Sequence, residues 1–193
     1  MSRSDDIEKT FKSAPHQRLR VVLHSLAFGT LKNFIHGDEK DEIQQAQVEM
    51  TLNVMASSLI YWAQDLTRRG LITEGTQIYA MTSAGGSRVW PTYGAVSAAK
   101  ASLESNIRQL ALELAPKGAS ANAILAGVTD TPALRKIPGH ENMIETATKR
   151  NPFKRLTTTQ DVADVIACFA KGLSNAWLTG NVIRVDGGEN IVD

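Results

Sequence analysis

The chain has 193 residues, a length that fits one domain, residues 1–193, around a single hydrophobic core. Hydrophobic residues make up 42% and charged residues 21% of it, as in ordinary soluble proteins. A net charge of +1 argues against a nucleic-acid partner. There is no signal sequence or membrane-length apolar run, and the only cysteine, Cys168, suits a reducing compartment. We therefore expect a cytoplasmic protein without a membrane span. The histidines show no ligand-like spacing, which predicts no metal site.

The first third of the chain predicts a helix, a strand and a second helix. Ser4 can cap a short helix over residues 5–13. Residues 19–28 form an apolar, β-branched run, typical of a strand covered on both faces. After a loop, residues 41–69 predict one long helix, because apolar residues recur there at helical spacing (Leu52, Met55, Leu59, Trp62 and Leu66).

The rest of the chain alternates strands with helices. Residues 76–82 predict a strand, residues 93–115 a long helix and residues 119–125 a buried strand. Two proline-containing turns and a short helix are expected in a mobile segment over residues 132–151. The chain ends with a helix and a strand, at residues 160–171 and 181–186. This order predicts an α/β fold with a doubly wound, mostly parallel sheet.

Three polar residues converge where the second strand ends and the following helix begins. Tyr93 and Lys100 are seven positions apart, which is two helical turns, so both lie on one helix face. A nearby ammonium lowers the pKa of a tyrosine, and such a tyrosine can donate a proton or a hydrogen bond to a developing oxyanion. Ser83 ends the preceding strand and can supply a further hydroxyl. The same spacing also arises by chance on ordinary helices, so the spacing alone leaves a non-catalytic interpretation open.

The residues around this cluster resemble the short-chain dehydrogenase/reductase family, and within it the enoyl-acyl-carrier-protein reductases. Common members carry Tyr-x3-Lys, but that tyrosine position is Val96 here. Tyr93 and Lys100 instead give Tyr-x6-Lys, the enoyl reductase spacing, and Ser83 keeps the family's separation from the lysine. The segments HSLAFG, NPFKR and TGNVIRVDGG also resemble family signatures, and together these matches cover most of the chain.

The resemblance implies further site residues. Asn53 stands where many members have a helix asparagine that supports a proton relay. Ser25, Leu26 and Ala27 belong to the segment that passes the adenosine side of the cofactor. The stretch NAILAGVTDT is similar to the loop that holds the nicotinamide carboxamide, which places Gly127, the backbone of Val128 and the hydroxyl of Thr131 near the cofactor. Lys100 is expected to hold the nicotinamide ribose.

Two departures from the family pattern stand out. The usual Pro-Gly of the nicotinamide loop is Ala126-Gly127, a small change. The larger departure is that no Gly-x3-Gly-x-Gly cluster follows a strand, whereas family members seat the cofactor pyrophosphate on such a turn. By the resemblance, the first three strands are absent and the strand at residues 19–28 becomes a sheet edge, which natural proteins usually protect. We consider, in this order, a shortened version of a longer chain, an edge completed by a partner, and a domain kept as an interaction module.

The function that the resemblance implies is hydride transfer from NADH or NADPH to an α,β-unsaturated acyl thioester, carried by acyl carrier protein or coenzyme A. Tyr93 would stabilise the enolate oxygen, Lys100 would hold the ribose, and Ser83 and Asn53 would assist. The segment at residues 132–150 would close over the acyl chain. One alternative is a carbonyl or alcohol oxidoreductase of the same family, and another is a non-catalytic binding remnant. The apolar stripes of the two long helices favour a homo-oligomer.

Overall fold

A four-stranded parallel sheet forms the centre of the protein. The computed structural model describes residues 18–172 and 176–192. The strands are β1 (Val21–His24), β2 (Gln77–Ser83), β3 (Ser120–Ala126) and β4 (Val182–Val185), in the spatial order β1-β2-β3-β4. Every neighbouring pair is parallel. The α/β, doubly wound architecture predicted from the sequence is therefore confirmed.

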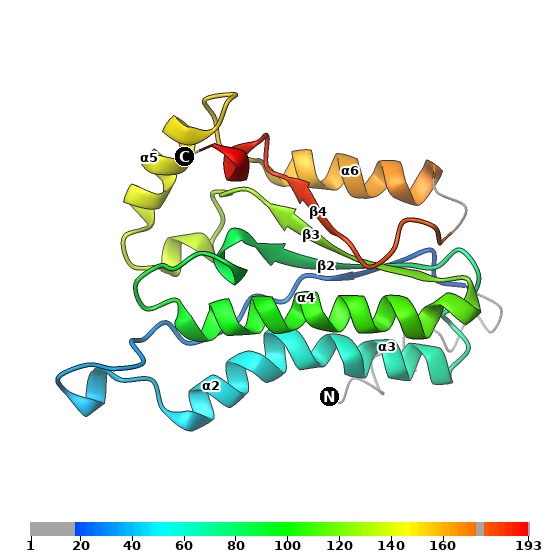
Figure 1. The fold of residues 1–193 in the computed structure, drawn as a ribbon, viewed down its shortest axis with the longest axis horizontal. Helices are drawn as coiled ribbons and strands as arrows, with labels where there is room; N and C mark the ends of the chain where they lie inside the picture. The colour runs from blue at the N-terminus through cyan, green and yellow to red at the C-terminus, as the bar shows by residue number, and fades with distance from the viewer. Residues whose placement is uncertain (1–17, 173–175, 193) are drawn as a thin grey trace.

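Helices cover both faces of this sheet (Figure 1). The helices α2 (Gln45–Leu52), α3 (Ser58–Arg68) and α4 (Gly94–Leu114) lie on one face, and α6 (Thr159–Gly172) lies on the other. The helix α5 (His140–Arg150) stands beside the carboxyl ends of the strands, next to the short helix η5 (Leu134–Lys136). The helix predicted over residues 5–13 lies outside the described residues.

The core forms as two layers because alternate side chains of a strand point to opposite faces. Ile78 and Ala80 of β2 pack with the apolar stripes of α3 and α4. Tyr79 points to the other face, where its ring stacks on Phe169 of α6 with centroids 6.2 Å apart. Because both faces are covered, nearly every residue of β2 and β3 is buried, including their polar residues.

The helix predicted over residues 41–69 is interrupted in its middle. A π-helical segment, η2 (Asn53–Ser57), separates α2 from α3, and the Ser58 N–H bonds to the carbonyl of Asn53 five residues earlier. Asn106 of α4 donates its side-chain amide to the Ala56 carbonyl within this segment (3.3 Å). The apolar spacing did not reveal the interruption, because one extra residue barely changes a stripe of this length.

The strand β1 is shorter than predicted and lies at one edge of the described sheet. Only residues 21–24 pair with β2, whereas the apolar run extends to residue 28. Residues 25–28 continue past the sheet with exposed side chains. Leu23 within the strand is 47% exposed, as expected for an edge position.

Gly29 provides a test of the packing that follows β1. A Cβ at this position would lie 2.7 Å from Thr51 Cγ2 and 3.0 Å from Val96 Cγ2, so a methyl group must push α2 and α4 apart. We expect Gly29→Ala to lower the free energy of unfolding by about 1–3 kcal/mol in denaturant titrations. Gly37→Ala is the control, because no atom lies within 4 Å of its Cβ, and its effect should stay within about 0.5 kcal/mol. Equal effects of the two substitutions would contradict this packing.

Candidate active site

Tyr93 and Ser83 lie side by side where β2 ends and α4 begins. Tyr93 is the N-cap residue of α4, and Ser83 is the last residue of β2. Between them lies Gly85, where a Cβ would come within 2.5 Å of Tyr93 Cε1 and 3.3 Å of Ser83 Oγ. Only glycine leaves room for the tyrosine ring at this position, so the backbone of residue 85 packs directly against Tyr93 and Ser83.

Burial controls the acidity of the tyrosine. Desolvation raises the pKa of Tyr93, and the neighbouring Ser83 hydroxyl acts in the opposite direction. The Ser83 hydroxyl is buried next to the tyrosine, and its Oγ meets hydrogen-bond geometry with no group among the described residues. The sequence predicted a pKa lowered by Lys100. That direction is wrong here, and Tyr93 is a protonated donor at neutral pH.

Lys100 is buried, and its ammonium is directed at the end of β2. Lys100 Nζ donates a hydrogen bond to the Met81 carbonyl (2.7 Å), two residues before Ser83. Burial lowers the pKa of Lys100 to about 8, and the Glu104 carboxylate acts in the opposite direction. The ammonium has three donors, and this bond uses one of them. The predicted cluster of Tyr93, Lys100 and Ser83 is therefore assembled at one end of the sheet.

Two further polar residues complete this cluster, and sequence reasoning missed both. Thr82 Oγ1 donates to Glu104 Oε1 (2.7 Å), which connects β2 to α4 one turn beyond Lys100. Gly86 packs against Glu104 and Lys100: a Cβ on Gly86 would lie 3.3 Å from Glu104 Oε1 and 3.4 Å from Lys100 Cβ. The spacing of four between Lys100 and Glu104 was the available signal, since it places both residues on one helix face.

A neutral histidine lies near the lysine. His24 Nε2 is 2.8 Å from Ser58 Oγ, and that hydroxyl donates its proton to the Val54 carbonyl (2.7 Å). His24 must therefore donate from Nε2. Burial first, and then the charge of Lys100, lower the pKa of His24 to about 4. The imidazole ring therefore stays neutral and adds no positive charge near Lys100.

The residues expected near the adenosine and in the proton relay lie at more open positions. Ser25, Leu26 and Ala27 are exposed and follow β1 at the carboxyl end of the sheet. Asn53 is exposed at the junction of α2 and the π-helical segment. Nothing in their contacts assigns them a role, so the interpretation from the resemblance stays a prediction.

The predicted nicotinamide loop is held tightly by the protein itself. A Cβ on Gly127 would lie 2.4 Å from Thr157 Oγ1 and 2.8 Å from Glu189 Oε2, so no larger residue fits. The Val128 N–H donates to Glu189 Oε2 (2.9 Å), and its carbonyl accepts from the Thr157 N–H (3.2 Å). The resemblance placed the Val128 backbone near the cofactor, and this stays a prediction: the Val128 N–H is used by Glu189, whereas its carbonyl can accept a second hydrogen bond.

Thr131 keeps a donor for a ligand. Its Oγ1 accepts from the Leu134 N–H (3.2 Å), which leaves the hydroxyl proton unused in that bond. The intervening Thr129 turns its own hydroxyl toward the Gly127 carbonyl (3.0 Å). Within this loop the Thr131 hydroxyl therefore still has a proton to donate, and its predicted contact with the cofactor stays a prediction.

Trp90 connects the turn before Tyr93 to the predicted lid segment. Its Nε1 donates to the Pro138 carbonyl (3.3 Å), and the Tyr93 N–H bonds back to the Trp90 carbonyl (3.1 Å). Thr92 between them has φ +63°, a conformation that is strained for a β-branched residue. Such strain at the residue before the tyrosine is typical of a functional turn.

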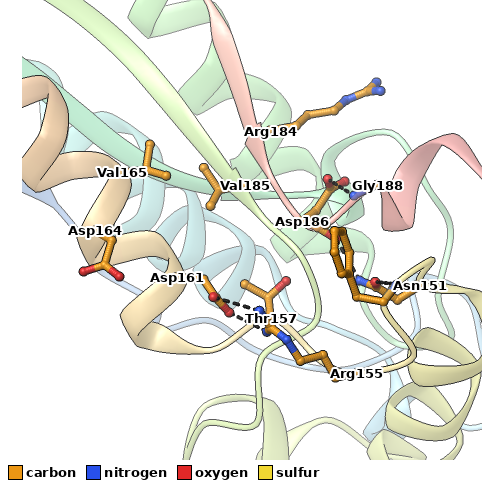
Figure 2. A pocket seen from close by; sticks show the side chains of 12 residues that line it. Asn151, Arg155, Thr157, Asp161, Asp164, Val165, Arg184, Val185, Asp186 and Gly188 are labelled. Carbon is orange, nitrogen blue, oxygen red and sulfur yellow. Dashed lines mark hydrogen bonds and ion pairs between the residues drawn. The ribbon is translucent and has the colours of Figure 1, made fainter.

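A separate cavity of about 440 Å³ opens between β4, α6 and residues 151–157 (Figure 2). Its lining includes the ion pair of Arg155 with Asp161, together with Arg184 and Asp186. None of the predicted site residues lines it. The part of the chain that the structure describes also holds no cluster of three metal-ligating side chains and no helix able to cross a membrane.

The buried histidine predicts an acid-sensitive contribution to stability. Because its pKa falls from 6.5 to about 4 on folding, the folded protein binds fewer protons than the unfolded chain between these values. The free energy of unfolding should therefore decrease as the pH falls from 6.5 to 4. We expect His24→Gln to remove about 2–3 kcal/mol of this decrease, measured by urea titration at several pH values. The exposed His36→Gln variant should retain it, and a His24→Gln profile parallel to wild type would refute the assignment.

Comparisons with known proteins agree with this arrangement. The family model described as enoyl-(acyl carrier protein) reductase matches residues 1–190. The enoyl-[acyl-carrier-protein] reductase [NADH] FabI of Aquifex aeolicus is 32% identical over all of this chain and 70% of its own length. The Buchnera aphidicola enzyme of the same name is 32% identical over 88% of this chain and 64% of its own length.

Solved structures give the same result. The Bacillus cereus enoyl-acyl carrier protein reductase, crystallised with NADP⁺ and an indole naphthyridinone, superposes with a TM-score of 0.85 at 28% identity, covering 98% of this chain and 72% of that chain. The chain thus spans roughly two thirds of the length of the curated relatives it matches. The matching model, the shared fold and the Tyr93–Lys100 cluster lead to one conclusion: the chain belongs to the enoyl-(acyl carrier protein) reductase family.

Proposed function

We propose that this chain takes part in reducing the carbon–carbon double bond of an α,β-unsaturated acyl thioester, with NADH or NADPH as the hydride donor. The observation that carries the proposal is the protonated Tyr93 beside the buried Ser83 hydroxyl, on the helix and the strand that the Lys100–Met81 hydrogen bond joins. The relatives support this reaction class, since the Aquifex protein is named an NADH enzyme and the Bacillus structure contains NADP⁺.

The residues present fit the nicotinamide half of such a cofactor. Lys100 has donors beyond its bond to Met81, and the hydroxyl of Thr131 keeps its proton. Ser83 Oγ is a buried polar atom that has no hydrogen-bond partner among the described residues, as expected of a group that binds a ligand. When bound, the cofactor supplies a hydride to the β-carbon of the thioester.

The side chains then act on the charge that develops at the thioester oxygen. Tyr93 donates a hydrogen bond or a proton to that oxygen, because its raised pKa keeps the phenol protonated. Ser83 adds a second donor from the end of β2, and donors fixed in a buried site stabilise an oxyanion without reorganisation. Lys100 orients the ribose and contributes a nearby positive charge. Asn53 is proposed to support proton resupply from its exposed position.

The substrate would enter beside the segment over residues 132–150. This segment contains η5 and α5 and contacts the tyrosine turn through Trp90 and Pro138. We infer that it covers the acyl chain of a substrate carried by acyl carrier protein or coenzyme A. We also propose self-association, because α3 and α4 lie on one face and present exposed Tyr61 and Leu112.

A carbonyl reductase of the wider family is the second candidate enzyme. The displaced tyrosine position, with Val96 buried in the core instead, argues for the enoyl reductase. A binding module without catalysis is the third candidate, and the turnover assay below separates it from the two enzymes.

Cofactor binding tests whether the described half-site is sufficient. We expect saturable enhancement of nicotinamide fluorescence when NADH or NADPH is titrated into the purified chain. Lys100→Ala should weaken binding more than tenfold, because it removes the group that holds the ribose. Tyr93→Phe should bind almost normally, since its hydroxyl serves the substrate. Identical curves for wild type and Lys100→Ala would exclude this role of the lysine.

The pH dependence of the same binding tests the charge on the lysine. Because the folded pKa of Lys100 is about 8, cofactor affinity should fall as the pH rises through that value. Glu104→Gln should move this midpoint to lower pH, because Glu104 raises the pKa of the lysine. Glu113→Gln, at an exposed position about two and a half turns further along α4, is the matched control. A midpoint that does not move in Glu104→Gln would contradict the assignment.

Two thioesters separate the enzyme candidates. We expect oxidation of the reduced cofactor with a crotonyl thioester and much slower oxidation with an acetoacetyl thioester. Tyr93→Phe should reduce the crotonyl rate about 10²–10³-fold through loss of an oxyanion donor. A preference for the acetoacetyl thioester would favour the carbonyl reductase, and turnover of neither thioester would favour the binding module.

A further inference from the structure

Glu189 is a buried carboxylate that the predicted mechanism does not use. It is 2% exposed and begins the short helix η6 (Glu189–Ile191) directly after β4. Its Oε2 accepts the Val128 N–H (2.9 Å), and its Oε1 accepts Arg150 Nη2 (3.1 Å). One side chain thus contacts the first and the last residue of the 128–150 loop, the segment that begins beside Gly127 and ends with α5.

The turn that carries Glu189 is itself fixed. Gly188 has φ +82°, which favours glycine, and its N–H bonds to Asp186 Oδ1 (3.0 Å). Asn190 donates both its backbone N–H and its side-chain amide to Asp186 Oδ2. Asn151, the residue after Arg150, donates to the Asp186 carbonyl (2.9 Å). Figure 2 shows the Asp186 carboxylate directed toward Gly188, with Asn151 on the neighbouring segment. The carboxylate therefore has a fixed position relative to β4.

The surroundings of the carboxylate leave little freedom. A Cβ on Gly127 would lie 2.8 Å from Glu189 Oε2, so the loop backbone packs directly on the acid. The Arg150 side chain is only 20% exposed, so the pair is largely removed from water. Removing one partner of such a buried ion pair is costly, because it leaves the other charge buried without compensation.

We propose that Glu189 is a positioning residue that closes the base of the 128–150 loop by holding both of its ends. The start of the loop, next to the predicted nicotinamide contacts, and its end at α5 then keep one position relative to β4. The link to cofactor binding rests on the proposed function, whereas the closing of the loop base does not.

Hydrogen exchange on the full 193-residue chain without cofactor tests the proposal. In Glu189→Gln we expect the Val128 amide and the segment around residues 147–151 to exchange at least tenfold faster, while β2 and β3 exchange as in wild type. Arg150→Met should give the same pattern. Glu145→Gln is the matched control, because it removes a carboxylate from α5 that pairs with Lys149 in an exposed ion pair, and its loop should exchange as in wild type. Unchanged exchange at Val128, or equal acceleration over the whole sheet, would overturn the proposal.

A second variant and a second readout complete the test. If Glu189→Gln does not fold, the double variant Arg150→Met/Glu189→Met buries no unpaired charge and is measured in the same way. In folded variants, the dissociation constant for NADH should rise about tenfold in Glu189→Gln and stay constant in Glu145→Gln. A wild-type chain that binds neither NADH nor NADPH would reject the proposed function, while the exchange data would still decide whether Glu189 closes the loop.

Discussion

The hydrogen bond from Lys100 Nζ to the Met81 carbonyl is the contact on which the candidate site depends. It connects the first turns of α4 to the last residues of β2, and so fixes Tyr93 relative to Ser83. An ammonium is costly to bury, and this cost appears in its lowered pKa of about 8. The protein offsets the cost with Glu104, which is itself held by Thr82. Removing any member of this cluster would change the position or the charge of the lysine.

The carboxyl ends of the parallel strands bring the remaining groups together. β1 delivers His24, β2 delivers Ser83, and the loop after β3 delivers Thr131 to the same end of the sheet. This is the end where open α/β sheets bind their ligands. Glu189 after β4 then holds the loop that follows β3. Each strand thus contributes one group, and the parallel pairing sets their relative positions.

Much of this arrangement could be predicted from the sequence. The apolar residues of β2 and β3 and the stripe of α4 were predictable because they are local patterns. The resemblance carried by Tyr93, Lys100 and Ser83, rather than their spacing alone, pointed to the candidate site. The π-helical segment at Asn53–Ser57 was missed, because its extra residue hardly alters a helical stripe. The direction of the Tyr93 pKa was also wrong, since the sequence shows a nearby charge but not the depth of burial. The role of Glu189 could not be predicted from the sequence, because its partners Val128 and Arg150 are distant from it in the chain.

The central claim is that the Tyr93 cluster supports hydride delivery to the β-carbon of an enoyl thioester. The most direct measurement is a single-turnover reaction of the 193-residue chain with a crotonyl thioester and NADH or NADPH carrying deuterium at C4, followed by mass spectrometry of the product. The account predicts one deuterium at the β-carbon and a hydrogen from solvent at the α-carbon. Deuterium at any other carbon would contradict the account, as would product formation that Tyr93→Phe leaves unchanged.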